Sequence, residues 1–146
     1  MMNKRQRKKY LKSKGKYISM SELWDLDYTF ADFILPRLKA FKKNTISVPA
    51  QLSETEWNDI LDKMILAFDY IIAEDSWWID DPRYDYIDYC HFSHSLTKEG
   101  LRQVSITEEE RGKKIKEAYF KEEKRRCAVI EEGLALFAKY FRDLWI

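Results

Sequence analysis

The clearest pattern of apolar and polar positions along the chain predicts a helix over residues 53–72. Ser53 and Glu56 have the S-x-x-E spacing of a capping box, in which the two side chains satisfy free backbone amides at a helix start. The apolar positions that follow fall in an arc of about 140° at about 100° per residue. They are Trp57, Ile60, Leu61, Met64, Ile65, Phe68, Ile71 and Ile72. We therefore expect one face of this helix to enter a core.

The same spacing predicts an earlier helix from Asp27 to about Lys43, with Asp27 as its N-cap. Its apolar positions are Phe30, Phe33, Ile34, Leu38 and Phe41. Pro36 lies inside this pattern. Because proline lacks a backbone donor and clashes with the preceding turn, we expect a kink there.

A third, long helix is predicted from Thr107 to about Leu144, since Thr107 and Glu110 repeat the capping-box spacing. Its first half is rich in lysine and arginine and is expected to be solvated. Its second half has one apolar stripe, formed by Ile130, Leu134, Phe137, Phe141, Leu144 and Trp145. A break is allowed near Gly112 or Gly133, because glycine lowers helix stability by about 1 kcal/mol relative to alanine.

Residues 75–106 show no sustained period and form an irregular, aromatic and acidic insertion. Residues 80–82 read Asp-Asp-Pro, which predicts a turn. Residues 84–92 alternate in part, and the sequence does not separate a short strand from an extended loop there. The expected fold class is therefore all-α, with three main helices, the first kinked at Pro36 and the last long.

Length and charge divide the chain into an arm and one domain. The 146 residues, 45% of them hydrophobic, suffice for one domain with a core, whereas 4 glycines and 3 prolines are too few for a turn-rich all-β fold. Residues 1–16 hold eight of the 26 basic side chains and no acid, so the remainder carries 18 basic and 25 acidic side chains. We expect a flexible basic arm over 1–16 and a single helical domain over 17–146.

Two classes of protein are disfavoured by the sequence. No run of about 18 apolar residues predicts a membrane span, and the basic N-terminus has no apolar segment behind it to act as a secretory signal. Cys90 and Cys127 do not make a disulfide framework, so a reduced, intracellular setting is expected.

Three segments together carry a resemblance to a known family. They are LWDLDYTFADFILPRLK at 23–39, EWNDILDKMI at 56–65 and EGLALFAKYF at 132–141. In sequence and in order they resemble a widespread group of small, uncharacterised proteins encoded by tailed bacteriophages. The resemblance implies a phage gene product that acts in the host cytoplasm or in the particle, and it brings no catalytic residues with it.

Arg37 is expected in the apolar arc of the first predicted helix, between Phe33 and Phe41. An isolated buried guanidinium would cost several kcal/mol, so it needs a partner. We expect a structural ion pair with Asp27, although Asp25 or a carboxylate of another helix would serve equally well. The alternative is an exposed arginine in a cleft that grips an anionic ligand.

No catalytic constellation, cofactor motif or metal site is expected. Cys90, His91 and His94 give one group of ligands without the second pair that zinc sites usually need. Phosphate-binding glycine loops and nucleophile-elbow motifs are absent from the sequence. A magnesium-dependent, all-α nucleotide pyrophosphohydrolase with Asp59, Asp62 and Glu132 as ligands is kept as an alternative, although the aspartates point away from the apolar arc.

The basic arm has the charge density for contact with phosphates. Its candidate nucleic-acid-binding residues are Lys4, Arg5, Arg7, Lys8 and Lys9. Counterion release would give salt-dependent affinity without sequence preference, although the acidic body would repel DNA. A solubilising tail, or attraction to an acidic protein, explains the same charges.

The aromatic insertion is the predicted partner-binding surface. Tyrosine and tryptophan are favoured at interfaces, and acids among them suit a basic partner. The candidate residues are Trp77, Trp78, Asp80, Asp81, Tyr84, Tyr86, Asp88 and Tyr89, and Phe92 is a further aromatic of the same surface. The competing interpretation is that these aromatics cover the helical core.

Together these patterns favour a non-enzymatic phage accessory protein of the host cytoplasm that binds a host or phage protein. Inhibition of a host defence or nucleic-acid enzyme, as by an anti-CRISPR protein, is one concrete form. The alternatives are the magnesium-dependent hydrolase and a nucleic-acid-associated virion protein that uses the basic arm. The sequence leaves the oligomeric state open.

Overall fold

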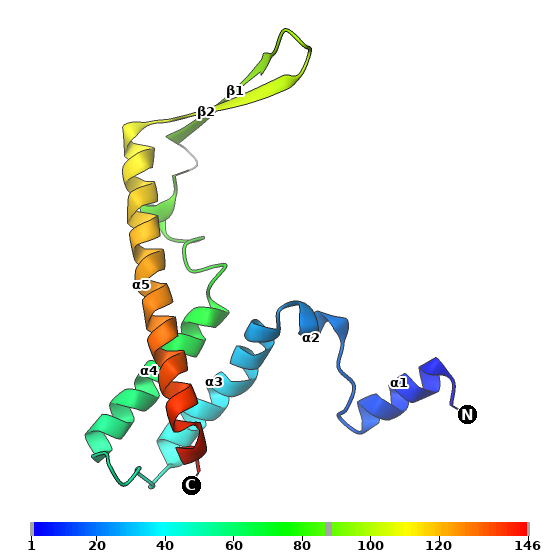
Figure 1. Ribbon diagram of the computed structural model, residues 1–146, viewed down its shortest axis with the longest axis vertical. Helices are drawn as coiled ribbons and strands as arrows, with labels where there is room; N and C mark the ends of the chain where they lie inside the picture. The colour runs from blue at the N-terminus through cyan, green and yellow to red at the C-terminus, as the bar shows by residue number, and fades with distance from the viewer. Residues whose placement is uncertain (1, 87–88, 146) are drawn as a thin grey trace.

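The computed structural model describes residues 2–86 and 89–145, which are mostly helical but include one two-stranded antiparallel sheet (Figure 1). The predicted all-α class is therefore wrong, because part of the insertion and the start of the last predicted helix pair as strands. The elements are α1 (Lys4–Ser13), α2 (Met20–Trp24), α3 (Leu26–Asn44), α4 (Glu54–Ile72), η1 (Pro82–Tyr84), β1 (Cys90–Leu96), β2 (Arg102–Glu108), α5 (Glu110–Tyr140) and η3 (Phe141–Asp143).

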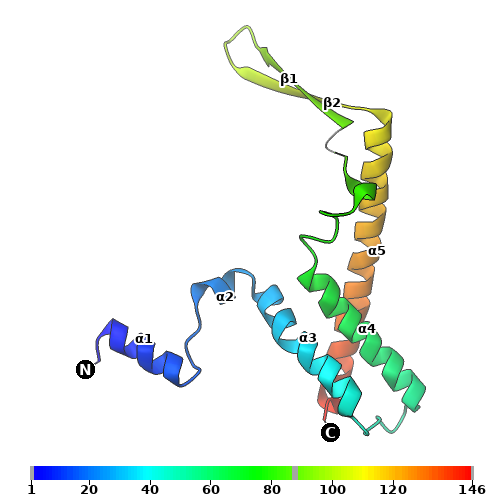
Figure 2. The same cartoon turned by 180° about the vertical axis from the view of Figure 1, so that it is seen from behind.

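The core lies where α4 packs against both α3 and α5 (Figures 1 and 2). The buried side chains come from all three helices: Ala31, Leu35, Leu38, Trp57, Leu61, Met64, Phe68, Phe137 and Tyr140. The helix predicted over 53–72 is confirmed as α4, and the helix predicted from Asp27 to Lys43 is confirmed as α3 within one residue at each end. Phe30 and Phe33, expected in the core, are instead exposed.

The start of α4 follows the sequence prediction. The Glu56 amide donates to the Ser53 hydroxyl at 3.3 Å, and the Ser53 amide donates to the Glu56 carboxylate at 2.8 Å. This is the predicted capping box, and it satisfies two backbone donors that would otherwise have no partner.

The other two predicted helix starts differ from the structure. Asp25, not Asp27, is the N-cap of α3, and its side chain makes no capping hydrogen bond. Thr107 lies in β2, and α5 begins at Glu110 with Glu109 as its N-cap. The predicted capping box at Thr107 is therefore wrong, because that residue is held in a strand by pairing with His91.

Gly133 permits a close crossing of α5 and α4 rather than breaking α5, which continues to Tyr140. A Cβ atom at this position would lie 2.2 Å from the Cβ of Ala67 and 2.6 Å from the carbonyl oxygen of Lys63. Both distances are shorter than van der Waals contact, so only glycine lets the two helices approach this closely.

The strands β1 and β2 form a hairpin that projects from the start of α5, away from the three-helix core (Figures 1 and 2). Cys90 pairs with Glu108 at its base and Leu96 with Arg102 near its tip. The Thr97 amide donates to the Leu101 carbonyl at 2.9 Å, and Gly100 takes a φ of 77° that other residues rarely adopt. The open choice between strand and loop over 84–92 thus resolves into a strand from Cys90 onwards.

The basic arm contains a helix where the sequence predicts a lack of order, since residues 4–13 form α1. The Gln6 amide donates to the Asn3 side chain at 2.9 Å, and the Asn3 amide donates to the Gln6 side chain at 3.0 Å. This helix stands apart from the core in both views (Figures 1 and 2). Among the described residues, no helix combines the length and apolarity that crossing a bilayer requires.

Candidate functional site

The hairpin has one apolar and one polar face. Residues directly opposite each other in an antiparallel pair point to the same side of the sheet. One side therefore joins Cys90 with Glu108, Phe92 with Ile106, His94 with Val104, and Leu96 with Arg102. The other side joins His91 with Thr107, Ser93 with Ser105, and Ser95 with Gln103, and it is polar throughout. We call Phe92, Leu96, Val104 and Ile106 the hairpin apolar face.

The hairpin apolar face is open to solvent. Its four side chains are between 53% and 72% exposed. An isolated two-stranded hairpin is at best marginally stable in water, and three or more strands or a covering helix are usually needed. An uncovered apolar face on such a hairpin is therefore typical of a surface that another molecule covers.

The base of the hairpin is fixed to α5 by several contacts. The Glu109 amide donates to the Tyr89 carbonyl at 3.0 Å, and Lys116 Nζ donates to the Glu108 carboxylate at 2.9 Å. That hydrogen bond raises the pKa of Lys116 above its ordinary value. His91 Nε2 lies 2.8 Å from the Glu109 carboxylate, which adds a third link. These links set the direction in which the hairpin leaves the helix.

The predicted aromatic surface is divided by the structure. The Trp77 ring stacks on Tyr119 of α5 at 5.2 Å between centroids, and Tyr84 meets Trp77 edge-on at 5.0 Å. Tyr84 is buried. Burial is also the main cause of the raised pKa of Tyr119. For Trp77 and Tyr84 the geometry favours the competing interpretation, in which they cover a helix.

Two of the remaining predicted aromatics lie on an open pocket. Trp78 and Tyr86 border a cavity of about 280 Å³, whose lining is Trp78, Tyr86, Lys116, Tyr119, Phe120 and Glu123. The guanidinium carbon of Arg111 lies over the Tyr89 ring, 5.0 Å from the centroid of that ring. Trp78 and Tyr86 therefore remain available to a partner, and Tyr89 belongs to the base of the hairpin.

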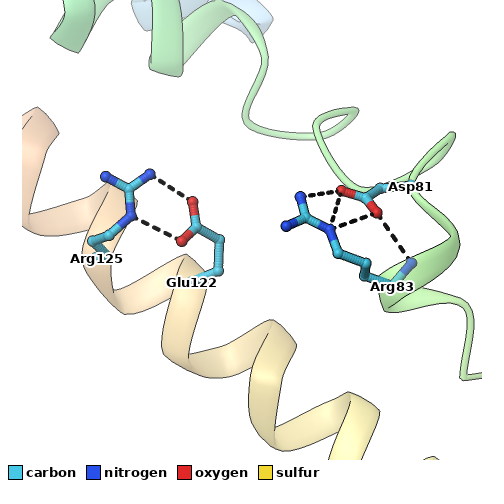
Figure 3. Close-up of polar contacts among 4 residues, drawn as sticks. All are labelled: Asp81, Arg83, Glu122 and Arg125. Atoms are coloured by element: carbon cyan, nitrogen blue, oxygen red, sulfur yellow. Dashed lines mark hydrogen bonds and ion pairs between the residues drawn. The ribbon is translucent and has the colours of Figure 1, made fainter.

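The predicted acidic residues of this surface have different environments. Asp81 accepts hydrogen bonds from the Arg83 amide and guanidinium, the shortest at 2.6 Å, which hold its pKa below the ordinary value (Figure 3). Asp80 is exposed, and Asp88 lies outside the described residues. Asp81 thus stabilises the turn into η1, and its charge is paired with Arg83 rather than free for a partner.

A second arginine–carboxylate pair lies within α5, and its arginine also contacts α4. Arg125 donates two hydrogen bonds to Glu122, at 2.6 and 2.8 Å, and lowers the pKa of that carboxyl (Figure 3). Arg125 also donates to the Tyr70 hydroxyl at 3.1 Å, and Arg126 lies 3.8 Å from the centroid of the same ring. Part of the positive charge of α5 therefore serves to hold the helix pair.

Arg37 does not form the predicted ion pair with Asp27. It is exposed, donates to the Phe33 carbonyl at 2.6 Å, and lies 3.6 Å from the centroid of the Phe33 ring. Asp27 is ten residues earlier on the same helix, about 15 Å along the axis, which is beyond the reach of the two side chains. Water solvates the guanidinium, so no internal carboxylate is required.

The acids proposed as magnesium ligands are bound to lysines. Lys63 Nζ lies 2.8 Å from Glu132 and 3.8 Å from Asp59, and Lys42 pairs with Asp62. Within residues 2–86 and 89–145, no group of three or more histidine, cysteine, aspartate or glutamate side chains is placed to hold a metal ion. Lys42–Asp62 joins α3 to α4 and Lys63–Glu132 joins α4 to α5, on the surface, as expected of a solvated face.

Leu96, Val104 and Ile106 were not among the predicted site residues. The sequence signal for them was the apolar–polar alternation of residues 102–107, together with Gly100, which marks a turn before this segment. Comparison with protein-family models, curated proteins and solved structures found no match.

Proposed function

We propose that this chain is a non-enzymatic accessory protein of a tailed bacteriophage that acts in the host cytoplasm by binding another protein. The single observation that carries the proposal is the hairpin apolar face, exposed at the start of α5. Inhibition of a host defence or nucleic-acid enzyme remains its most concrete form. The resemblance of residues 23–39, 56–65 and 132–141 supports the phage assignment.

The geometry of the hairpin supports a protein partner. Its apolar face presents aliphatic and aromatic side chains, which gain free energy when another apolar surface removes them from water. The two strands also have unpaired backbone edges, to which a strand of a partner can add. Trp78 and Tyr86 lie near the base of the hairpin, where Lys116 contacts both their pocket and Glu108, so they extend the same surface.

The proposal is tested by replacing with serine both residues of the hairpin pair in which the two partners are apolar, Phe92→Ser with Ile106→Ser. The wild-type chain, immobilised, is used to capture partners from phage-infected cells, and the captured protein is then purified and its affinity measured. We expect the double variant to lose at least about a hundredfold in affinity, the range of a binding hot spot.

The matched control is Ser93→Ala with Ser105→Ala, the neighbouring pair on the polar face. It should change affinity by no more than about threefold, a difference well under 1.4 kcal/mol. Circular dichroism should show unchanged helix content in both variants, since neither touches the core. Equal binding by the Phe92 and Ile106 variant would reject the hairpin as the site, and Trp78→Ala would then report on the aromatic pocket.

A second function, contact with nucleic acid, is favoured by α1. The helix carries Lys4, Arg5, Arg7, Lys8, Lys9 and Lys12 without an acid, and all six are exposed. Like charges one turn apart repel each other, which destabilises the free helix. Phosphates would remove this repulsion, so binding of a nucleic acid backbone would stabilise the helix.

Replacing Lys4, Arg5, Arg7, Lys8 and Lys9 by glutamine tests this second function. The logarithm of DNA affinity against the logarithm of salt concentration should have a slope of about −0.9 per phosphate contact for the wild type. In the variant the slope should become shallower by about 0.9 for each contact removed, as measured by fluorescence anisotropy with a duplex of mixed sequence. An unchanged slope would reject phosphate contact by these five residues.

The hydrolase alternative finds no support in the geometry. Asp59, Asp62 and Glu132 each contact a lysine ammonium, so a magnesium ion would have to displace those cations. The hydrogen bond from Lys63 to Glu132 also raises the lysine pKa, which keeps the ammonium charged.

A further inference from the structure

A second uncovered apolar surface lies on the helical core. Leu26, Phe30 and Phe33 of α3 follow the spacing i, i+4, i+7, and Leu134 of α5 and Phe141 of η3 lie seven residues apart. Phe137 joins the two sets, since its ring centroid is 6.1 Å from that of Phe30 and 5.5 Å from that of Phe141. We call Leu26, Phe30, Phe33, Leu134 and Phe141 the core-side apolar face.

The size of the core-side apolar face fits a stable interface. Its five side chains are between 39% and 60% exposed, and Leu23 and Trp24 of α2, directly before α3, are exposed as well. At about 100 Å² for each half-exposed large side chain, the seven offer about 700 Å². This is more than the largest patch on a typical monomer and near the roughly 800 Å² that each partner buries in a standard complex.

Two charged residues of α3 indicate which molecule covers the core-side apolar face. Arg37 continues the row of Leu26, Phe30 and Phe33 at i+11, and among the described residues it contacts no carboxylate. Asp27 is exposed and follows Leu26 at the opposite end of the row, about 100° round the helix from it, on the side of α3 that borders Ile71 and Ile72 of α4. The row therefore has two phenylalanines in the middle and a base at one end, and an acid flanks its other end.

A row of this kind is complementary to itself when reversed. In an antiparallel pair of α3 helices with a two-fold axis between Phe30 and Phe33, each Phe30 lies level with Phe33 of the other copy. Arg37 then lies level with Leu26 and Asp27 of the other copy, because the axial rise is about 1.5 Å per residue. Two-fold dimers need such a self-complementary patch.

We propose that a second copy of this chain covers the core-side apolar face, with α3 packed antiparallel on α3 and Arg37 of each copy paired with Asp27 of the other. The apolar side chains supply the buried area, and the two ion pairs set the register. The proposal concerns a surface distinct from the hairpin apolar face, so it stands independently of the proposed function.

The first test is the oligomeric state of the full chain by sedimentation velocity. We expect the wild type to be a dimer at about 10 µM and Phe33→Ser to weaken the dimer by at least about tenfold. Phe33 is exposed in the single chain, so the variant should keep its helix content. Phe92→Ser, in the hairpin, is the matched control and should leave the dimer intact. A monomeric wild type, or a dimer indifferent to Phe33→Ser, would overturn the proposal.

The second test uses charge exchange between two preparations. Arg37→Asp and Asp27→Arg should each weaken self-association by about tenfold or more, since like charges then face each other. When the two singly substituted chains are mixed, both contacts again join opposite charges, so a heterodimer should form. An ion pair within one chain could not be restored by mixing. Mixed chains that sediment as monomers would refute the assigned register.

Lys43→Asp is the charge control for this exchange. It removes an exposed cation from α3 that lies outside the row of Leu26, Phe30, Phe33 and Arg37. It should leave the dimer within about threefold of the wild type. A loss as large as that of Arg37→Asp would show that net charge, and not the Arg37–Asp27 contact, governs association, and would also overturn the proposal.

Discussion

Gly133 sets the distance between two helices through the absence of a side chain. A Cβ atom at this position would meet Ala67 and Lys63 of α4, at 2.2 and 2.6 Å. Sequence reasoning treats a glycine in a helix as a weak point, since propensity alone disfavours it. At this position the close packing of α5 on α4 outweighs propensity, and the helix continues through it.

Gly133→Ala therefore distinguishes the two effects by sign. Propensity alone would stabilise the protein by about 1 kcal/mol, whereas overpacking at a tight contact costs about 1–3 kcal/mol. Because a backbone carbonyl is one of the atoms in the way, we expect a net loss of stability in urea unfolding. Ala138→Gly, at an exposed position of the same helix, should lose about 1 kcal/mol from propensity alone. A more stable Gly133→Ala variant would contradict the close crossing.

Arg37 shows how far a single residue could be interpreted from the sequence. Its place among apolar positions correctly marked it as a charged residue on an otherwise apolar side of the helix. The inference of an internal partner failed because periodicity gives the angle of a residue around a helix and not what covers that side. The side of α3 that packs into the core carries Ala31, Leu35 and Leu38. Arg37 and Phe33 lie on the neighbouring side and stay exposed to water.

At the scale of single elements, local signals predicted α4 well and the start of α5 poorly. The capping box at Ser53 and Glu56 acts within four residues, so the sequence contains all of its information. Thr107 and Glu110 have the same spacing, but Thr107 pairs with His91, sixteen residues earlier. Pairing between strands is not visible in a short window, and it decided the outcome there.

The capping box of α4 predicts how stability depends on pH. The Ser53 amide and hydroxyl, in that order of importance, lower the pKa of Glu56 below its ordinary value of 4.5. A lowered folded-state pKa means that the carboxylate stabilises the fold above pH 4.5, and that this stability is lost as the pH falls through the folded-state pKa.

Glu56→Gln tests this dependence, since glutamine keeps the capping geometry without the charge. We expect the variant to be less stable than the wild type at pH 7, and the difference to shrink below pH 4.5, in urea unfolding at each pH. Asp59→Asn, three residues further along α4 and not part of the capping box, is the control. A difference that stays constant down to pH 3 would contradict the assigned hydrogen bonds.

At the scale of the whole molecule, the three-helix core was predictable and the two exposed apolar faces were not. Burial of one face of α4 followed from its amphipathic pattern, and Leu61, Met64 and Phe68 lie where that pattern places them. The hairpin apolar face depends on a fold-back between residues 96 and 102, and the core-side apolar face on which sides of α3 and α5 meet α4. Both depend on the relative placement of elements, which a one-dimensional pattern does not contain.

The length of α5 has a consequence for how firmly a target could be held. Its 31 residues span about 46 Å, and the hairpin and Phe141 lie at opposite ends of it. Two copies joined near the Phe141 end would present two hairpins, each at the far end of its own α5 helix. A target with repeated or symmetric subunits could then be gripped twice, and the second contact would form at a high effective concentration. Such bivalent capture would give slow release from a large assembly even when each hairpin alone binds weakly.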